Sequence, residues 1–228
     1  MHRYRGSDRC LTPLGPGSDT GLTPSSLRYW KPIQTGIEAD DDTAEVSRLG
    51  ACAAEEIFDR GVRLPRPVSP HLAARLAGQP IRIDDLVGLA AGEPADDRWI
   101  VEGAGGALAP VNESALMIDL MVRLGLPVVI VARTTLGTIN HTLLTIEALR
   151  ARSLDVAGVV MVGDANADNR DAIAHYGRAR ILGEMPRFDL LEPDALEAWA
   201  VAHLDPGGAL DGIFRGPERP TLQERRTP

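Results

Sequence analysis

The feature that most constrains the fold of this chain is the repeated alternation of short apolar runs with helical patterns. Apolar runs predict buried parallel strands at 27–30, 99–101, 126–132, 156–162 and 180–182. Helical periodicity predicts helices at 43–49, 70–76, 114–124, 140–153, 169–176 and 191–204. Strands that alternate with helices predict an α/β fold, in which a mostly parallel sheet has helices on both faces.

The length of the chain favours one domain. Its 228 residues, 44% of them hydrophobic, suffice for a single α/β core. We expect that domain to cover 29–205, preceded by an irregular segment at 1–28 and followed by a flexible tail at 206–228, because both ends are rich in glycine and proline. The site is expected at the carboxyl ends of the strands.

Composition excludes several classes of function. A formal net charge of −8 argues against a nucleic-acid surface, which needs a concentrated basic footprint. No apolar stretch reaches the roughly 20 residues of a membrane span, and the first ten residues lack an apolar signal core, so a cytoplasmic protein without a membrane partner is expected. Cys10 and Cys52, with no Cys/His cluster, predict free thiols rather than a disulfide framework or a zinc site.

The segment 98–106, RWIVEGAGG, ends an apolar strand in Glu102 and continues as a glycine-rich turn. A carboxylate followed by small residues suits a site where an acid holds a metal while backbone N–H groups approach a phosphate. A glutamate that only opens a turn is the alternative. Three glycines around one acid, Gly103, Gly105 and Gly106, favour the functional interpretation.

Lys31 is the only lysine of the chain. It lies in 29–36, YWKPIQTG, where Pro32 ends regular strand hydrogen bonding, so its ammonium is expected at the same rim as Glu102. The alternatives are a surface lysine and chance in an arginine-rich chain. Thr35 either donates a hydrogen bond to a ligand or only caps the turn.

Two further segments begin helices. In 38–43, EADDDT, the aspartates cap the helix or one of them holds a metal, and periodicity does not choose which. In 136–145, LGTINHTLLT, the N–H groups of Gly137, Thr138 and Ile139 form an anion site, or Thr138 or Asn140 caps the helix.

The segment 67–71, PVSPH, predicts a helix capped by Ser69 with Pro70 at its first position. Ser69 and His71 are too close in sequence to imply a nucleophile–base pair.

Taken in order, these strings resemble the dethiobiotin synthetase family over about residues 29–190. YWKPIQTG resembles its lysine motif, PVSPH its S-P-H turn, VEGAGG its metal-and-phosphate motif, and LGTINHTLLT its substrate-side helix start. GEMP at 183–186 is similar to its nucleotide-base loop. Five motifs in register carry the resemblance.

The resemblance implies a homodimeric relative of the P-loop NTPases, with a three-layer α/β sandwich. It implies that 7,8-diaminononanoate takes up CO2 or bicarbonate as a carbamate, which ATP phosphorylates. The second amine then closes the ureido ring of dethiobiotin, with release of ADP and phosphate. ATP is the implied co-substrate and Mg²⁺ the implied cofactor.

Roles for individual residues follow only from the resemblance. Lys31 would be the catalytic lysine that steadies carbamate and phosphoryl oxygens, Thr35 a substrate contact, and Asp42 and Glu102 the ligands of Mg²⁺ and nucleotide. The other implied residues bind the substrate carboxylate (Gly137, Thr138, Ile139 and Asn140), the phosphates (Gly103, Ala104 and Gly105) and adenine (Pro186, Arg187 and Phe188).

The chain departs from the family pattern in two places. Members begin with a strand and the loop G-T-D-T-x-x-G-K-T, but Lys31 already belongs to KPIQTG, so no lysine of this sequence is left for that loop. GSDTG at 17–21 resembles only its front half, and about a dozen or more residues are missing. Val162 and Gly163 stand where many members have a base-reading asparagine.

Three interpretations therefore compete. The chain is a dethiobiotin synthetase whose altered N-terminus reduces or abolishes activity, or an active enzyme whose arginines supply the phosphate contacts. In the third, it is a noncatalytic relative, or another P-loop ATPase of the partitioning type, that acts as a binding protein. The KPIQTG and PVSPH pair favours the first, since a partitioning ATPase would not need it.

Overall fold

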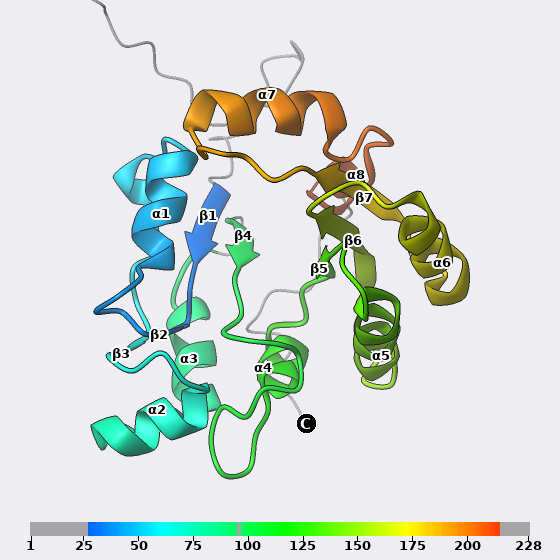
Figure 1. The fold of residues 1–228 in the computed structure, drawn as a ribbon. Helices are drawn as coiled ribbons and strands as arrows, with labels where there is room; N and C mark the ends of the chain where they lie inside the picture. The colour runs from blue at the N-terminus through cyan, green and yellow to red at the C-terminus, as the bar shows by residue number, and fades with distance from the viewer. Residues whose placement is uncertain (1–26, 95–96, 215–228) are drawn as a thin grey trace, which may run out of the picture.

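The computed structural model describes residues 27–94 and 97–214, and it shows parallel strands that alternate with helices (Figure 1). Its strands are β1 (Leu27–Trp30), β2 (Ile33–Thr35), β3 (Val62–Leu64), β4 (Arg98–Val101), β5 (Val128–Arg133), β6 (Val156–Val162) and β7 (Ile181–Met185). Its helices are α1 (Asp42–Leu49), α2 (Pro70–Ala77), α3 (Ile83–Ala90), α4 (Met117–Leu124), α5 (Thr138–Arg150), α6 (Ala167–Gly177), α7 (Pro193–His203) and α8 (Ala209–Phe214), with a 3₁₀ turn at Ala54–Glu56. The predicted α/β fold is confirmed.

Hydrogen bonds join the described strands in three groups, all parallel. β1 pairs with β4, β2 pairs with β3, and β5, β6 and β7 form a three-stranded sheet. Figure 1 shows the β1–β4 pair and the β5–β6–β7 sheet on the two sides of α4, while α7 crosses over from α1 to β7. Within each group, the parallel strands bring their carboxyl ends to the same edge.

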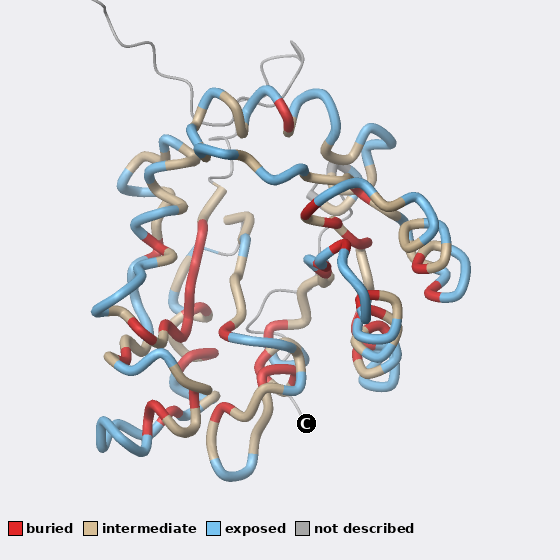
Figure 2. Tube along the Cα trace, in the orientation of Figure 1, coloured by how far each residue is buried: buried red, intermediate tan, exposed pale blue. Residues whose placement is uncertain are grey.

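The hydrophobic core follows this division. One buried cluster lies among β1 to β4 and α2 to α4, and it contains Trp30, Leu64 and Leu120. A second lies among β5, β6, α5 and α6, and it contains Leu149 and Met161. Figure 2 shows buried stretches along β1 and on α4 and α5. Both clusters reach α4, so this helix joins the two halves of the molecule.

The periodicity located most elements within a few residues. Helix α4 begins at Met117 rather than at 114 because the Asn112 side chain accepts hydrogen bonds from the backbone N–H groups of Ser114 and Ala115, which holds those residues in a turn. β2 and β3 were not predicted, because three residues are too few to establish a period.

Two helices were also missed. Helix α3 combines two acidic residues with a short apolar face, and α8 lies inside the stretch 206–228 that was expected to be an irregular tail. The expected irregular N-terminus lies outside the described residues except for 27–28, which belong to β1, and GSDTG at 17–21 and Cys10 also lie outside them. Within the described ranges, none of the helices is long and apolar enough to cross a membrane.

Candidate active site

The carboxyl ends of β1 and β4 bring Lys31 and Glu102 together. The two strands pair in parallel with Trp30 opposite Val101, and the next residue of each strand is the charged one. The Glu102 N–H donates to the Trp30 carbonyl at 2.9 Å, which extends this register into the site. Lys31 Nζ lies 2.7 Å from Glu102 Oε1. Strand pairing between segments about 70 residues apart in sequence therefore builds the first ion pair.

Asp42 completes a cluster of three charges. It is the first residue of α1, and its Oδ2 pairs with Lys31 Nζ. The preceding residue, Asp41, is the helix cap, because its side chain accepts a hydrogen bond from the Ala44 N–H at 3.1 Å. The structure thus separates two of the three aspartates that the sequence left open: Asp41 caps the helix, and Asp42 contacts the lysine.

The cluster combines a buried cation with partly exposed acids. The Lys31 side chain is 5% exposed, whereas Asp42 is 32% and Glu102 43% exposed. One positive and two negative charges leave an excess negative charge at the solvent side of the cluster. Because a buried ammonium is costly without partners, the two carboxylates stabilise Lys31 in this position.

Tyr29 is a further member of this cluster that sequence reasoning missed. Its hydroxyl donates to Glu102 Oε2 at 2.6 Å, so each oxygen of that carboxylate has a partner. Burial, followed by the hydrogen bond and the charge of Glu102, raises the pKa of Tyr29 far above its ordinary value. The phenol therefore stays a protonated donor. Strand periodicity gave a signal, since residues two apart in a strand share one face.

Two other side chains hold the backbone around the cluster. Arg63 Nη1 donates to the Lys31 carbonyl at 2.9 Å, and Arg63 Nη2 contacts Asp59 at 2.7 Å. The buried Gln34 amide donates to the carbonyls of Thr35 and Asp40 at 3.0 and 3.2 Å. Gln34 thereby fixes the turn that leads into α1 and to Asp42.

Gly36 explains part of the YWKPIQTG motif in structural terms. It has a φ of +75°, and a Cβ built there would lie 2.9 Å from the Pro67 Cβ. Only glycine fits both conditions well. Thr35, immediately before it, ends β2 and is half-buried. In the described ranges, no hydrogen bond or ion pair joins the Thr35 side chain to the charged cluster.

The glycine-rich turn after β4 starts beside Lys31. The Gly103 carbonyl lies 3.4 Å from Lys31 Nζ. Ala104 is buried in the first core cluster, so its methyl group anchors the turn, while Gly105 is exposed and has a φ of +79°. The turn therefore presents its backbone, rather than large side chains, near the three charges.

The β5–α5 connection differs from its expected caps. Gly137, with a φ of +92°, is the residue before the helix, and no side chain caps it. Thr138 instead donates through Oγ1 to the Arg133 carbonyl at 2.5 Å, which ties the first turn of α5 to the end of β5. Ile139 is half-buried and Asn140 exposed. The prediction that Thr138 or Asn140 caps the helix was wrong, and the first turn of α5 is left without a side-chain cap.

The departure at Val162 and Gly163 has a packing reason. A Cβ at Gly163 would lie 2.5 Å from Thr134 Oγ1, and Gly163 has a φ of +134°. Asn169 donates through Nδ2 to the Thr134 carbonyl at 2.9 Å. Close approach to the buried Thr134 therefore requires glycine at this position.

The segment proposed for adenine follows β7 directly. Pro186 and Arg187 are exposed and Phe188 is half-buried. Among the described residues, neither this segment nor 137–140 shares a hydrogen bond or an ion pair with Lys31, Asp42 or Glu102. They lie after other strands of the same parallel arrangement.

Ser69 precedes α2 and Pro70 is at the first turn, as predicted, but the serine makes no capping hydrogen bond. Its Oγ lies 3.1 Å from His71 Nδ1 instead. The sequence did not predict this local contact, and the contact does not test the prediction that the two residues are no nucleophile–base pair. The pair is local, and the His71 N–H also donates to the Pro110 carbonyl, so it fixes the start of the helix.

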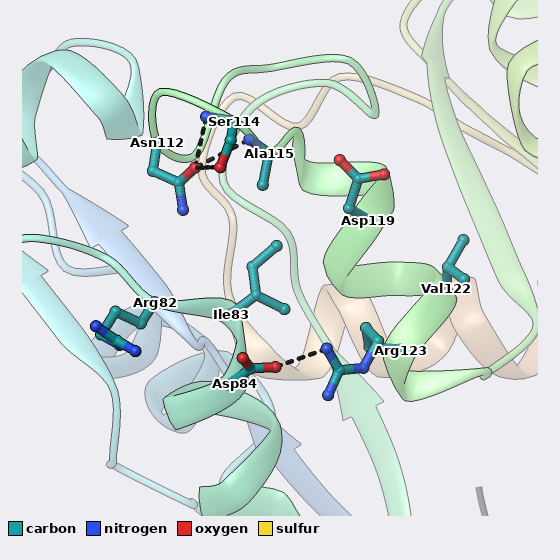
Figure 3. Close-up of a pocket in the computed structure, with 9 residues that line it drawn as sticks. All are labelled: Arg82, Ile83, Asp84, Asn112, Ser114, Ala115, Asp119, Val122 and Arg123. Atoms are coloured by element: carbon teal, nitrogen blue, oxygen red, sulfur yellow. Dashed lines mark hydrogen bonds and ion pairs between the residues drawn. The ribbon is translucent and has the colours of Figure 1, made fainter. Parts of the chain in front are cut away.

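A surface pocket of about 510 Å³ lies elsewhere, between α3, the turn at 112–115 and α4 (Figure 3). An ion pair of 2.6 Å between Arg123 and Asp84 runs along it. None of the residues predicted for the site lines it. Its lining residues are Arg82, Ile83, Asp84, Asn112, Ser114, Ala115, Asp119, Val122 and Arg123.

A complete protein-made metal cage is not found within residues 27–94 and 97–214, where no group of three or more His, Cys, Asp or Glu side chains converges. Mg²⁺ commonly needs less, since one or two carboxylates suffice when phosphates and water supply the other ligands. Asp42 and Glu102 both contact Lys31 Nζ, and the cluster of one ammonium and two carboxylates has an excess negative charge. Two such carboxylates could supply ligands to a divalent cation that a nucleotide carries.

Comparison with known proteins identifies the family. The family described as "AAA domain" matches residues 20–195. The chain is 44% identical to the ATP-dependent dethiobiotin synthetase BioD of Nitrobacter hamburgensis. The alignment spans 213 residues and covers 88% of this chain and 96% of that protein. Two proteins of the same name are 40% identical to this chain. The alignment with the Rhodopseudomonas palustris protein spans 200 residues and covers 83% of this chain and 92% of that protein. The alignment with the Brucella ovis protein spans 190 residues and covers 79% of this chain and 88% of that protein.

These alignments also contain residues that this chain lacks. The alignment with the Nitrobacter protein has 213 positions. It covers 88% of the 228 residues of this chain, which is fewer residues than there are aligned positions. Some residues of the relative therefore have no counterpart in this chain. The resemblance drawn from five motifs is confirmed by similarity over most of the chain, and the chain belongs to the dethiobiotin synthetase family.

Proposed function

We propose that this chain catalyses the ATP-dependent closure of the ureido ring of dethiobiotin from 7,8-diaminononanoate and CO2. The observation that carries the proposal is the position of Lys31, whose ammonium lies between Asp42 and Glu102 at the rim of the parallel strands. Family membership supports the reaction, since the relatives are named ATP-dependent dethiobiotin synthetases.

Lys31 is the proposed catalytic residue. Its ammonium is buried and lies between the carboxylates of Asp42 and Glu102. There the charge would stabilise the carbamate oxygens and the oxygens of the transferred phosphoryl group, which gain negative character in the transition state. A preorganised ammonium costs no rearrangement at the moment of reaction.

Asp42 and Glu102 are the proposed ligands of Mg²⁺ and contacts of the nucleotide. When bound, the cation would neutralise charge on the β- and γ-phosphates. Tyr29 holds Glu102 from the other side at 2.6 Å and so orients its carboxylate. Backbone N–H groups of Gly103, Ala104 and Gly105 are proposed to approach the phosphates, because the turn is free of large side chains there.

The substrate and the base are proposed to bind at neighbouring strand ends. Thr35 would contact the substrate. The start of α5 at 137–140 would receive its carboxylate through first-turn N–H groups other than that of Thr138, which donates to the Thr135 carbonyl at 3.1 Å. Pro186, Arg187 and Phe188 would lie against adenine. A homodimer, in which residues 137–140 contribute across the interface, and a cytoplasmic location are parts of the same proposal and rest on the family resemblance.

We further propose that the phosphates are held less tightly than in the relatives. The only lysine of the chain is engaged in the charged cluster, so it does not supply a second ammonium to a phosphate loop. Charge-assisted hydrogen bonds are the strong ones, and losing several of them weakens binding. Calorimetric titration with MgATP should give a weaker affinity than the Nitrobacter relative in parallel, and micromolar affinity would contradict this part.

The direct test is an assay of dethiobiotin formed from 7,8-diaminononanoate, bicarbonate and MgATP. The wild-type chain is expected to form the product, and Lys31→Ala to abolish it. Arg123→Ala is the matched control, since it also removes a cation paired with an acid at 2.6 Å but outside the cluster. Unchanged turnover in Lys31→Ala would remove the proposed role of this residue. If product forms neither in the wild type nor in a variant with a complete phosphate-binding loop, the proposed reaction is wrong.

A further inference from the structure

The carboxyl ends of β5, β6 and β7 place three residues in one row. At the last position of each strand, Arg133 pairs with Val162, and Val162 pairs with Met185. The residues that follow these positions form the strand-end row, which consists of Thr134, Gly163 and Pro186. The Gly163 N–H donates to the Met185 carbonyl at 2.9 Å, so the pairing of β6 with β7 continues into the row.

Thr134 directs its hydroxyl toward Gly163. A Cβ built at Gly163 would lie 2.5 Å from Thr134 Oγ1, but 3.6 and 3.8 Å from the Cβ and Cγ2 atoms of the same side chain. Gly163 also has a φ of +134°, which residues with a Cβ rarely adopt. The Thr134 hydroxyl therefore occupies the place where a side chain of residue 163 would begin.

This hydroxyl is the accessible part of a buried residue. Thr134 is only 5% exposed. Within residues 27–94 and 97–214, its Oγ1 makes no hydrogen bond, yet it is not one of the unpartnered side-chain oxygens that the protein encloses completely. Polar groups of buried residues normally have a partner, because a hydrogen bond left unmade there costs free energy. The unpaired hydroxyl therefore indicates a contact with a ligand.

Hydrogen bonds from both neighbouring helices hold the backbone of Thr134 in place. The Thr134 carbonyl accepts from Asn169 Nδ2 of α6 at 2.9 Å, and Asn166, which caps that helix, accepts from the Asn169 N–H at 3.0 Å. The carbonyl of Arg133 accepts from Thr138 Oγ1 of α5 at 2.5 Å. The hydroxyl is thus preorganised, and ligand binding has little left to order at this residue.

We propose that the Thr134 hydroxyl contacts the nucleotide base and is the residue that sets base specificity in this chain. The inference rests on the proposed function, in which the base lies against the segment that begins with Pro186 of the same strand-end row.

The chemistry of these groups predicts weak discrimination between bases. A threonine hydroxyl serves as donor or as acceptor, so it bonds to the amino group of one base or to the keto oxygen of another. Pro186 has no N–H with which to read a base edge. Stacking on an aromatic ring such as that of Phe188 tolerates every base. Adenine, guanine and cytosine nucleotides are therefore expected to bind with similar affinity.

The test is an NMR titration of the full chain that measures dissociation constants for MgATP, MgGTP and MgCTP, and for magnesium tripolyphosphate as a probe without a base. The three nucleotides are expected to bind within about threefold of one another, and more tightly than tripolyphosphate. Thr134→Val keeps the shape of the side chain but removes the hydroxyl. It should weaken each nucleotide about threefold to tenfold, the effect of one hydrogen bond, and leave tripolyphosphate unchanged.

Two further variants separate the hydroxyl from its structural surroundings. Thr134→Ser retains the hydroxyl and should restore most of the affinity that Thr134→Val loses. Thr142→Val is the matched control, because Thr142 is also a buried threonine, 3% exposed, but lies within α5 and outside the strand-end row. It should leave all four dissociation constants unchanged.

Several outcomes would overturn the proposal. MgATP that binds tenfold or more tightly than MgGTP and MgCTP would show that more than one adaptable hydroxyl reads the base. Equal losses in the two valine variants, or a loss for tripolyphosphate in Thr134→Val, would show that Thr134 does not act on the base. Nucleotides that bind no more tightly than tripolyphosphate would refute the base contact altogether. The proposed reaction is judged separately, by dethiobiotin formation, which this titration does not measure.

Discussion

The two halves of this protein bury different kinds of residue. The half from β1 to α4 contains the buried Lys31 and Gln34, and it holds them with ion pairs and hydrogen bonds from several segments. The half from β5 to β7 has a sheet of three longer strands over an apolar cluster. The buried charged residues thus lie in the half with short strands and long connections, while the second half forms a more regular sheet.

This difference teaches how the site is positioned. Lys31, Asp42 and Glu102 come from three elements, and each is placed by backbone pairing or a helix start rather than by a loop alone. Tyr29 and Arg63 then fix the geometry. Preorganisation of this kind is what electrostatic catalysis requires. Fewer contacts hold the start of α5, chiefly the hydrogen bond from Thr138 Oγ1 to the Arg133 carbonyl. This suits a surface that receives a ligand.

The largest expected effects test whether the two halves are separate cores. Leu64→Ala and Leu149→Ala each remove a leucine with no exposed surface, one from each cluster. Each should lower the free energy of unfolding by about 2–5 kcal/mol, from lost burial and a residual cavity. Denaturant unfolding measures the cost, and hydrogen exchange should accelerate mainly in the mutated half. Equal acceleration in both halves would show that the cores behave as one.

The next comparison concerns cations in the two halves. Lys31→Met keeps most of the stem but leaves two acids facing each other, and it should lower the free energy of unfolding by about 1–3 kcal/mol. The value is below that of a fully buried pair because both acids are partly exposed. Arg150→Met, which loses hydrogen bonds to the carbonyls of Gly177 and Arg178, should cost about 0.5–1.5 kcal/mol. Thermal or urea unfolding that reverses this order would refute the contrast.

Tyr29→Phe is expected to have a smaller effect on stability, about 1 kcal/mol, because one hydrogen bond to a partly exposed carboxylate is lost. The pKa of Tyr29 is raised in the folded state, so its contribution is fully present below the unfolded value of about 10 and is lost as pH rises toward the folded value. The free energy of unfolding, measured at several pH values, should therefore be higher for the wild type than for Tyr29→Phe by a constant amount near neutrality. This difference should fall in strong alkali. A difference that grows with pH would contradict the assigned donor.

The smallest effect is expected for Arg170→Ala in the second half. Arg170 contacts Asp171 at 2.9 Å and Glu184 at 3.2 Å, but the arginine is 39% exposed. Exposed pairs contribute little to stability, and salt screens them. Unfolding at low and high ionic strength should show a difference that shrinks with salt. A cost as large as that of Lys31→Met would mean that charge is as important in this half as at the site.

The sequence predicted the regular elements of the second half well. The run at 156–162 became β6 without change, because seven apolar residues between polar turns have few alternatives. It predicted β2, β3 and α3 poorly. A three-residue strand is stabilised by its partner, here Ile33 opposite Val62, and such pairing leaves no local period.

What the sequence by itself determined was the kind of residue at each strand end: one lysine after the strand at 27–30, one glutamate after the strand at 99–101, and small residues behind it. Only the tertiary structure decided that these two strands are neighbours, that Asp42 rather than Asp41 meets the lysine, and that Tyr29 holds the glutamate. The physical reason is range. Periodicity and turn chemistry act over a few residues, whereas strand pairing and charge contacts join segments whose separation in sequence carries no local signal.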